Sequence, residues 1–467
     1  MQLMRHGALK ISDHSAKSPT PELKDAKKMK MSKPTCSASY HVLKGDSKLN
    51  EPPALLAEDE SEADDDEGTN KSPLWKALIN LMGDLEGTGT LALPYAISQS
   101  GLIAISGLII IPFIAFYTGA ILIDCLYDEN DAGERVRVRS NYKQLGEACS
   151  SRYSGTIVSA IQLIHLFLVA SLYLVLCASL ATGIFPDLPL SDKFWMFIAA
   201  AVVLPTLFLK DFSQVAWLSL INVIGFYIAV VTVLSYGIAH HLSWNPMIIS
   251  VWDIEGAPVS LAVISYSYIC HSTLPGLEAS MENRSQYRPM LGLAFFFAAI
   301  IKVIFSVFAF LSFSPNIQEV ISNSLPMGVI RTLVNTSLIL SVVFSYPFLV
   351  ISIIQIIEES VSEDCFSLKI PRIVWFIGIR VTTNFLTLLP AILIPHFALF
   401  MAFISSLTGS ATMFILPALF HLILKKKDLK LYHYIFDILI LIFGVYVGVV
   451  GLLYTGKSLF KTIFHDN

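Results

Sequence analysis

Long runs of apolar residues, separated by short polar stretches, fill the chain from residue 74 onward. A helix of about 20 apolar residues crosses the ~30 Å hydrocarbon core of a bilayer, so each long run predicts a membrane-spanning helix. Membrane strands are not expected, because no alternating barrel pattern appears and open strand edges cannot face lipid. The predicted spans cover residues 74–98, 101–127, 155–183, 193–210, 213–240, 256–281, 290–313, 327–358, 371–394, 396–424 and 432–456.

Composition supports this interpretation. Hydrophobic residues make up 54% of the 467 positions and charged residues 15%, and the mean hydropathy is +0.64. Soluble domains contain about 25% charged residues. We therefore predict an all-α, multi-pass membrane protein with eleven transmembrane helices. The six cysteines form no CxxC pair, so neither a disulfide framework nor a metal site is expected.

The first 72 residues differ from the rest of the chain. A lysine-rich segment, 23–33, precedes an acidic run at 58–67, and no signal-peptide core is present. Such composition buries too little apolar surface to offset ordering entropy, so we predict a disordered tail. Within it, EPPALL fits an acidic dileucine motif, in which Glu51, Leu55 and Leu56 would bind a clathrin adaptor. Coincidence explains so short a motif equally well.

Lysine and arginine placement predicts the orientation. Basic residues concentrate in loops on one side, for example ERVRVRSNYK at 134–143, whereas 243–258 and 314–327 on the other side contain none. The positive-inside rule puts the basic side and the N-terminal tail in the cytosol. With a transmembrane domain at 73–457, residues 458–467 would then form a short lumenal or extracellular tail.

Two predicted spans contain helix-breaking residues. MGDLEGTGTLALPYA at 82–96 has three glycines and a proline, and SYICHSTLPGLEA at 267–279 has Pro275 and Gly276. The breaks lie five spans apart. Interrupted spans at corresponding places in two halves indicate an inverted-repeat transporter with its site at the midplane. We predict a LeuT-like core of five plus five helices, with the eleventh as an addition.

An unwound segment at this depth survives only where it lines a polar cavity. The half-helix after the first break would point free amides and a positive dipole end into that cavity, which suits the carboxylate of an amino acid. A glycine-rich kink for helix packing is the alternative.

Ionisable side chains within the spans are candidates for proton coupling. Buried acids are costly and usually functional, which favours Asp84 and Glu86. His165 and His271 are candidates because imidazole titrates near vesicular pH. The alternatives are acids that solvate a wet vestibule and histidines that only make a hydrogen bond. Lys302 and Glu278 are expected to snorkel or to pair structurally near span ends.

Three stretches resemble one family. GTGTLALPYA at 87–96 is similar to the opening motif of the amino acid/auxin permease family. CLYDENDAGERVRVRSNY at 125–142 and PHFALFMAFISSLTGSATMFILPALFHL at 395–422 resemble its vesicular inhibitory amino acid transporter branch, which loads GABA and glycine into synaptic vesicles. The resemblance covers residues 75–454 and implies the broken-helix fold and coupling to the proton gradient of an acidic organelle. The substrate contacts it implies are Gly87, Thr88, Gly89, Thr90, Leu91, Ser267, Tyr268, His271, Thr273, Ser345 and Tyr346.

Two departures from that branch lie where substrate charge and proton coupling would be decided. The first break has GDLEG at 83–87 where the branch has a segment like NAIQG, and His165 stands where the branch has an acid. An added acid would favour a substrate with a second amine, or would move the proton-carrying role from the third span to the first.

The sequence thus predicts a proton-coupled secondary transporter of small amino acids, an exchanger of synaptic-vesicle or endolysosomal membranes. No enzymatic activity, cofactor, metal or nucleic-acid partner is expected, and no GxxxxGK[ST] loop for ATP is present. Chloride or sodium are alternative coupling ions. Two other functions stay open: a permease of the plasma, lysosomal or vacuolar membrane, and a sensor that binds amino acids and signals through its tail.

Overall fold

The computed structural model describes residues 71–150, 152–208, 212–244, 249, 252–360, 372–427 and 429–465. Residues 1–70 of the predicted tail, with the sorting motif at Glu51, Leu55 and Leu56, fall outside the described residues. At the end of the predicted tail, the backbone of Ser72 is hydrogen-bonded to Ser280 and Glu282.

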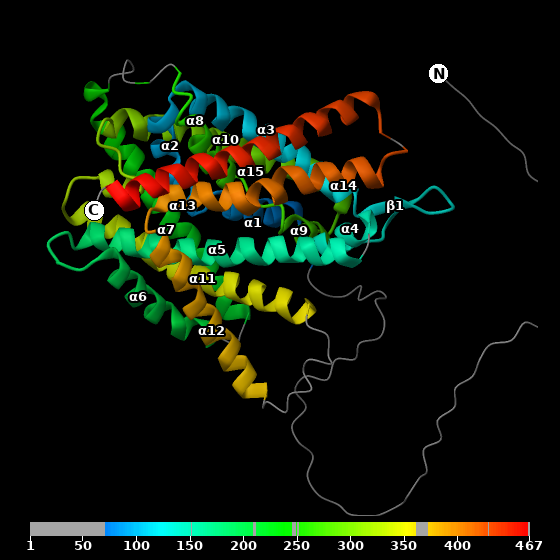
Figure 1. Cartoon of the computed structure of the whole chain (residues 1–467), viewed down its shortest axis with the longest axis horizontal. Helices are drawn as coiled ribbons and strands as arrows, with labels where there is room; N and C mark the ends of the chain where they lie inside the picture. Colours follow the sequence, from blue (N-terminus) through cyan, green and yellow to red (C-terminus); the bar gives the residue numbers. More distant parts are fainter. Residues whose placement is uncertain are drawn as a thin grey trace, which may run out of the picture. The chain divides into compact units, whose positions relative to one another are not determined.

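The described residues are almost entirely helical, as the apolar pattern predicts (Figure 1). One antiparallel hairpin, β1 (Tyr127–Glu129) and β2 (Arg135–Arg137), lies between two helices and begins at the last residue of the predicted span 101–127. The α-helices are α1 (Leu74–Leu85), α2 (Leu93–Ser100), α3 (Leu102–Asp124), α4 (Tyr142–Cys149), α5 (Arg152–Ile184), α6 (Asp192–Val203), α7 (Phe212–Ala239), α8 (Ala257–Tyr266), α9 (Leu274–Ala279), α10 (Tyr287–Phe313), α11 (Val329–Ser360), α12 (Arg372–Leu393), α13 (Phe397–Ile404), α14 (Leu416–Leu424) and α15 (Leu431–His465).

Short helical segments of other types connect them. The 3₁₀ segments are η1 (Thr88–Ala92), η2 (Leu204–Phe208), η3 (His241–Ser243), η5 (Arg284–Gln286) and η6 (Ile321–Ser324). Two π-helical segments, η8 (Ser405–Gly409) and η9 (Ala411–Ile415), join α13 to α14. They correspond to the SLTGSATMF part of the third family-like stretch. π-Helical turns are rare and occur frequently at functional sites.

Six of the described helices are long and apolar enough to cross a membrane, and the pair that meets at a 40° bend between 409 and 411 would make a seventh. The six are Leu102–Asp124, Tyr153–Ile184, Arg284–Phe313, Val329–Glu358, Ile373–Leu393 and Leu431–Lys461. The other predicted spans coincide with helices that are interrupted, short or described only in part. The total of eleven spans therefore stays a prediction.

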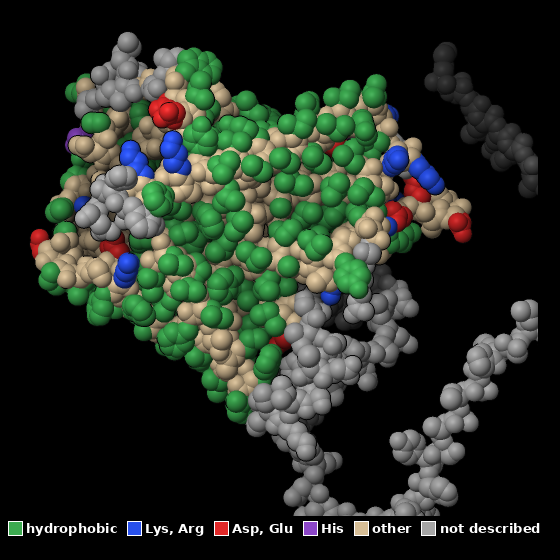
Figure 2. All heavy atoms as spheres, viewed as in Figure 1, with side chains coloured by type: hydrophobic (Ala, Val, Ile, Leu, Met, Phe, Trp, Pro, Cys, Tyr) green, Lys and Arg blue, Asp and Glu red, His purple; other side chains and the backbone are tan. Residues whose placement is uncertain are grey.

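The last helix differs from expectation at its end. α15 continues to His465, past residue 457, where we expected a tail to begin. Leu459 is buried, so the apolar pattern that holds α15 against the bundle persists beyond that point. On the face shown in Figure 2, hydrophobic side chains cover the middle of the molecule, and most charged side chains gather at the two ends, as a bilayer requires.

Both predicted helix breaks are present. α1 ends at Leu85, Gly87 is extended (φ −81°, ψ −165°), and α2 has Pro94 in its first turn. In the sixth predicted span, α8 ends at Tyr266 and α9 begins at Leu274. The intervening residues 267–273 form turns, because proline at the start of α9 lacks the donor that would continue α8.

The two ends of the bundle are held differently. On the end that contains Arg137, which we name the basic side, Glu278 of α9 is buried, pairs with Arg137 (3.5 Å) and accepts a hydrogen bond from Tyr127. Structural pairing of Glu278 is thereby confirmed. At the opposite side the loop 314–328 inserts Val320 and Ile321, both buried, between the helices.

Candidate substrate site between the two broken helices

The two breaks cross each other in direct contact. A Cβ atom placed on Gly89 would lie 3.0 Å from the Cα atom of Ser267, which is closer than side chains normally approach. The two breaks are also joined by a hydrogen bond of 3.0 Å, which the Thr273 hydroxyl donates to the Asp84 carboxylate. Glycine at position 89 thus permits the backbones of the first and sixth predicted spans to touch, and the breaks meet as the repeat hypothesis requires.

A cavity of about 170 Å³ lies at this crossing. An enclosed cavity of ~150 Å³ accommodates benzene, so the space suits a ligand of about six non-hydrogen atoms. The cavity is lined by Asp84, Leu85, Gly87, Thr88, Gly89, His165, Leu166, Val169, Tyr173, Tyr266, Ser267, Ile269, Cys270, Ser272, Thr273 and Leu349.

The polar groups that line this cavity have opposite character. The backbone N–H groups of Thr88 and Gly89 donate to no backbone carbonyl among the described residues. They begin η1, so they carry the positive end of the helical dipole. Asp84, in contrast, is exposed at the cavity and supplies a carboxylate. Free donors and an acid that line one cavity match the two charged ends of an amino acid.

The cavity continues toward the basic side. A second cavity of about 280 Å³ shares Leu166, Ser272 and Thr273 with the first and extends to Lys143. On the opposite side, η6 of the 314–328 loop contacts η1, and Asn323 donates to the Ser179 carbonyl oxygen (3.0 Å). The site is therefore open on one side of the bundle and closed on the other.

One face of α5 forms a wall of the site. His165, Val169 and Tyr173, spaced four residues apart, all line the cavity. The Nδ1 atom of His165 lies 2.9 Å from the hydroxyl of Thr408 in η8, so this wall also contacts the π-helical segment. The sequence analysis missed Tyr173. Its spacing from His165 places both on one helical face and is the signal that would have found it.

Several predicted substrate contacts lie outside the cavity. Thr90 and Leu91 are fully buried in the turn behind it. His271 approaches the hydroxyl of Thr118 (2.9 Å), and Tyr268 is buried away from the lining. In α11, the Ser345 hydroxyl donates to the carbonyl oxygen of Ser341 (2.9 Å) and Tyr346 is hydrogen-bonded to the Thr387 hydroxyl (2.8 Å). Leu349, about one turn along the helix, lines the cavity instead.

Glu86 does not line the cavity, although both of its neighbours do. It is 3% exposed, and neither carboxylate oxygen has a hydrogen-bond partner among the described residues. The expectation for Lys302 is wrong: this lysine lies in the middle of α10, is 0% exposed and donates to the carbonyl oxygen of Ser267. Packing decides which face of α10 is buried, and hydropathy along the sequence does not show that face. The burial of Lys302 could therefore not be predicted.

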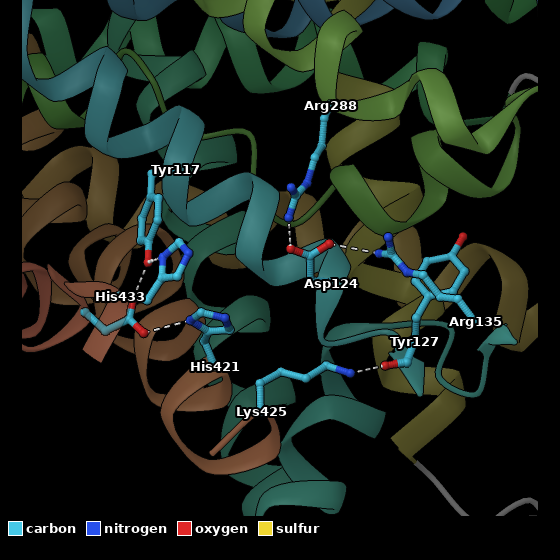
Figure 3. Close-up of polar contacts among 9 residues, drawn as sticks. Tyr117, Asp124, Tyr127, Arg135, Arg288, His421, Lys425 and His433 are labelled. Atoms are coloured by element: carbon cyan, nitrogen blue, oxygen red, sulfur yellow. Dashed lines mark hydrogen bonds and ion pairs between the residues drawn. The ribbon is translucent and has the colours of Figure 1, made fainter. Parts of the chain in front are cut away.

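A second polar cluster lies between α3, α14 and α15. In Figure 3, Tyr117, His421 and His433 converge from these three helices, and Asp437 joins them. Asp437 accepts from Tyr117 at 2.8 Å and lies 2.7 Å from His421. We name these four residues the Asp437 cluster; they fix three helices against one another.

Ion pairs and a hydrogen bond hold the hairpin on the basic side of the bundle. Arg135 and Arg288 both pair with Asp124, and Lys425 donates to the carbonyl of Tyr127 at 2.5 Å (Figure 3). These pairs connect the hairpin to α3, α10 and α14. The second family-like stretch, 125–142, thus forms a tie across the basic side rather than part of the cavity.

The sequence of this chain is similar to known proteins over most of its length. The profile of a family described as "Transmembrane amino acid transporter protein" matches residues 70–455. The chain belongs to the transmembrane amino acid transporter family. The vesicular inhibitory amino acid transporter of Xenopus tropicalis is 32% identical over 425 residues, covering 88% of this chain and 82% of that protein. The human protein of that name is 33% identical over 404 residues, covering 84% of this chain and 77% of the relative.

A more distant relative in this transporter family is the vesicular GABA transporter of Caenorhabditis elegans, which is 29% identical over 415 residues, covering 86% of this chain and 84% of that protein. The resemblance to the vesicular inhibitory branch is confirmed by these relatives.

Solved structures with the same fold are other helical membrane transporters. The manganese transporter of Eremococcus coleocola has a TM-score of 0.53 at 13% identity, covering 85% of this chain and 91% of that one. MhsT bound to L-phenylalanine has a TM-score of 0.50 at 10% identity, covering 83% and 100%. These likenesses concern the LeuT-like fold alone. In the described part of this transporter, no group of three His, Cys, Asp or Glu residues is placed to hold a metal ion.

Proposed function

We propose that this chain is a proton-coupled exchanger that loads small amino acids, of the GABA and glycine type, into acidic vesicles. The main support is the cavity where the two breaks cross, because its free amides and its acid complement a small zwitterion. The names of the relatives support the substrate class and the vesicular location.

In this proposal, the substrate carboxylate accepts from the N–H groups of Thr88 and Gly89, and the substrate amine approaches Asp84 across the cavity. A carboxylate at the start of a helix is stabilised by unpaired donors and by the dipole. Apolar lining residues, Val169 and Leu349 among them, limit the length of the substrate. His165 and Tyr173 complete the site on the α5 side.

The proposed topology has eleven spans, with the first ten forming two inverted halves of five around this site. The N-terminal tail and the basic side face the cytosol, which is the orientation favoured by the positive-inside rule. The described conformation then opens to the cytosol and is closed toward the lumen by 314–328. Alternating access requires that the second cavity closes and that this loop withdraws.

Protons are the proposed coupling ion because the interior of the bundle contains an acid, Glu86, whose carboxylate oxygens lack a hydrogen-bond partner among the described residues. Sodium or chloride would be the driving ions of the alternative mechanisms. A permease of the plasma, lysosomal or vacuolar membrane would use the same substrate site but would be sorted to a different membrane. Deleting Leu55 and Leu56 and following localisation separates these addresses, since unchanged vesicular targeting would remove the dileucine argument.

Uptake into proteoliposomes tests the proposal. The purified full chain is reconstituted, and a panel of radiolabelled amino acids is offered with and without an acidic interior. We expect accumulation of GABA or glycine only with the acidic interior. Accumulation of a different amino acid, or indifference to the pH gradient, would refute the proposed substrate or coupling.

A sensor without transport activity is the second candidate, favoured only by the long N-terminal tail. Removal of residues 1–70 separates the two functions. A carrier should keep its uptake without the tail, whereas a sensor should show no uptake in the intact protein.

A further inference from the structure

The broken sixth span ends against a lysine. Ser267 caps the C-terminus of α8, where carbonyl oxygens lack helical partners and the dipole is negative. The ammonium of Lys302 donates to the carbonyl oxygen of Ser267, and its Nζ atom lies 4.1 Å from the centre of the Tyr268 ring. Carbonyl groups at the end of an interrupted helix commonly coordinate the coupling cation in transporters of this architecture. Here a cation of the chain itself occupies that position.

A buried ammonium needs a compensating charge. Lys302 is 0% exposed, and an ionised group taken out of water is strongly destabilised unless it is paired. Glu86, 3% exposed, follows the last residue of α1, which packs against α10, and supplies the opposite charge for Lys302. The two do not form a close ion pair, because no Nζ–carboxylate distance falls within 4.0 Å. Attraction across that gap links the first break to α10.

The carboxylate of Glu86, unlike the ammonium of Lys302, lacks hydrogen bonds among the described residues. Both of its oxygens are buried and without a hydrogen-bond partner in the described residues, whereas Lys302 has a carbonyl and an aromatic ring. The other titratable groups that face the two side chains are Tyr227 from α7 and Tyr268 and Cys270 from the sixth break. The chain neighbours of Glu86, Leu85 and Gly87, line the cavity, so the route for a proton from the cavity to this carboxylate is short.

We propose that Lys302 and Glu86 form the ion-coupling pair of this transporter. The proposal rests on the proposed proton-coupled transport. When Glu86 is ionised, the pair is neutral and attracts the first break toward α10 and the end of α8. When Glu86 takes a proton from water in the cavity, an O–H bond forms on its carboxyl group and Lys302 loses its counter-charge. The first break is then released while Lys302 stays bonded to Ser267, and loss of the proton to water restores the attraction.

Two modes of transport separate coupling from binding. Full-length protein in proteoliposomes is assayed with radiolabelled GABA and glycine, first by accumulation driven by an acidic interior and then by counterflow without any gradient. The variants are Lys302→Met, Lys302→Arg and Glu86→Gln. Lys457→Met, at an exposed position of α15, is the control. Size-exclusion chromatography in detergent checks that each variant is folded.

In Lys302→Met and Glu86→Gln we expect gradient-driven accumulation to fall by roughly tenfold or more, within the usual range of coupling between sites. Counterflow should persist, because neither side chain lines the cavity. Lys302→Arg should retain part of the driven uptake since it keeps the charge, and the control should match the wild type in both modes.

The other results are equally decisive. Wild-type driven uptake by Lys302→Met overturns the proposal, and so does an equal loss of both modes in all three variants, which would make the pair structural. Accumulation by the wild type that requires sodium also overturns it. If the wild type transports no amino acid of the panel in either mode, the proposed function itself has failed, and the coupling proposal fails with it.

Discussion

Two buried acids in this molecule have opposite surroundings. Asp437, 0% exposed, has both carboxylate oxygens satisfied, one by Tyr117 and one by His421. Glu86, 3% exposed, has neither oxygen satisfied in the described structure and interacts with Lys302 only across a gap. Each lies within a bundle of apolar helices, so burial alone does not distinguish them.

The difference concerns what each site can do. A buried carboxylate with all its hydrogen bonds made is stable in a single arrangement and fixes its neighbours. An unsatisfied one is costly, and a protein retains it where the group changes its charge or partner. Changes at the Asp437 cluster should therefore act on stability, and changes around Glu86 and the crossing of the breaks should act on transport.

The largest effect is expected at the crossing itself. Gly89→Leu places a Cβ atom 3.0 Å from the backbone of Ser267 and fills the space next to the free amides. Overpacking of this kind costs about 1–3 kcal/mol, which corresponds to roughly 5- to 150-fold in substrate binding. Saturable binding of radiolabelled GABA and glycine measures it. Gly378→Leu is the matched control, because a Cβ atom there meets nothing within 4 Å; equal loss in both variants would contradict the proposed site.

Asp437→Asn should have the next largest effect, on stability. The change weakens two hydrogen bonds to a buried charged group, each worth about 1.5–3 kcal/mol. Thermal unfolding in detergent should show a clear drop in melting temperature, while counterflow per folded molecule stays normal. An unchanged melting temperature would mean that the cluster does not hold α3, α14 and α15 together.

Glu86→Gln should show the reverse pattern and a smaller change in stability. No described hydrogen bond to the carboxylate is lost, but Lys302 is left buried without its counter-charge, so the melting temperature should fall. The hydrogen bond from Lys302 to the Ser267 carbonyl oxygen remains and limits that fall. Uptake measured across a series of pH gradients should lose its dependence on the gradient. A strong drop in stability with an unaltered pH profile would assign Glu86 the same structural role as Asp437.

Asp128 in the hairpin provides the smallest expected effect. Partial burial raises the pKa of its carboxyl, but Arg139, at 2.7 Å, and Lys425 lower it further, so the net pKa lies below the usual 3.8. Because the pKa is depressed in the folded state, its stabilisation is complete above about pH 4 and is lost only as pH falls through the folded-state pKa. Asp128 is partly exposed, so the contribution should stay below about 1 kcal/mol.

Thermal unfolding of Asp128→Asn and wild type, compared from neutral to strongly acidic pH, checks this. The small difference between them should be constant through the vesicular range, begin to shrink near pH 4 and be lost as pH falls through the folded-state pKa. A difference that changed near pH 6 would make the hairpin a pH-responsive element, which this account excludes.

Local chemistry made part of the site predictable. Glycine and proline disrupt a helix wherever they stand, so both breaks, and with them Asp84, Thr88, Ser267 and Thr273, could be found from the sequence. The contact between Gly89 and Ser267 could not be measured from it, but the recurrence of the break indicated that the two would meet.

Features that depend on packing were not predictable in the same way. Which face of α10 turns inward decides whether Lys302 snorkels or is buried, and hydropathy does not contain that information. Along α11, a shift of one turn separates Ser345 and Tyr346 from the cavity and brings Leu349 to it. The hairpin escaped notice because its strands are only three residues long and polar.

The central claim is that each amino acid that enters the vesicle through this cavity is exchanged for protons that leave it. Proton movement in proteoliposomes with a pH-sensitive dye inside tests it most directly, with GABA or glycine added outside an acidic interior. The account predicts that the interior becomes more alkaline as substrate enters, and that Glu86→Gln takes up substrate by counterflow without this change. Substrate entry into wild-type vesicles with no proton movement would contradict it.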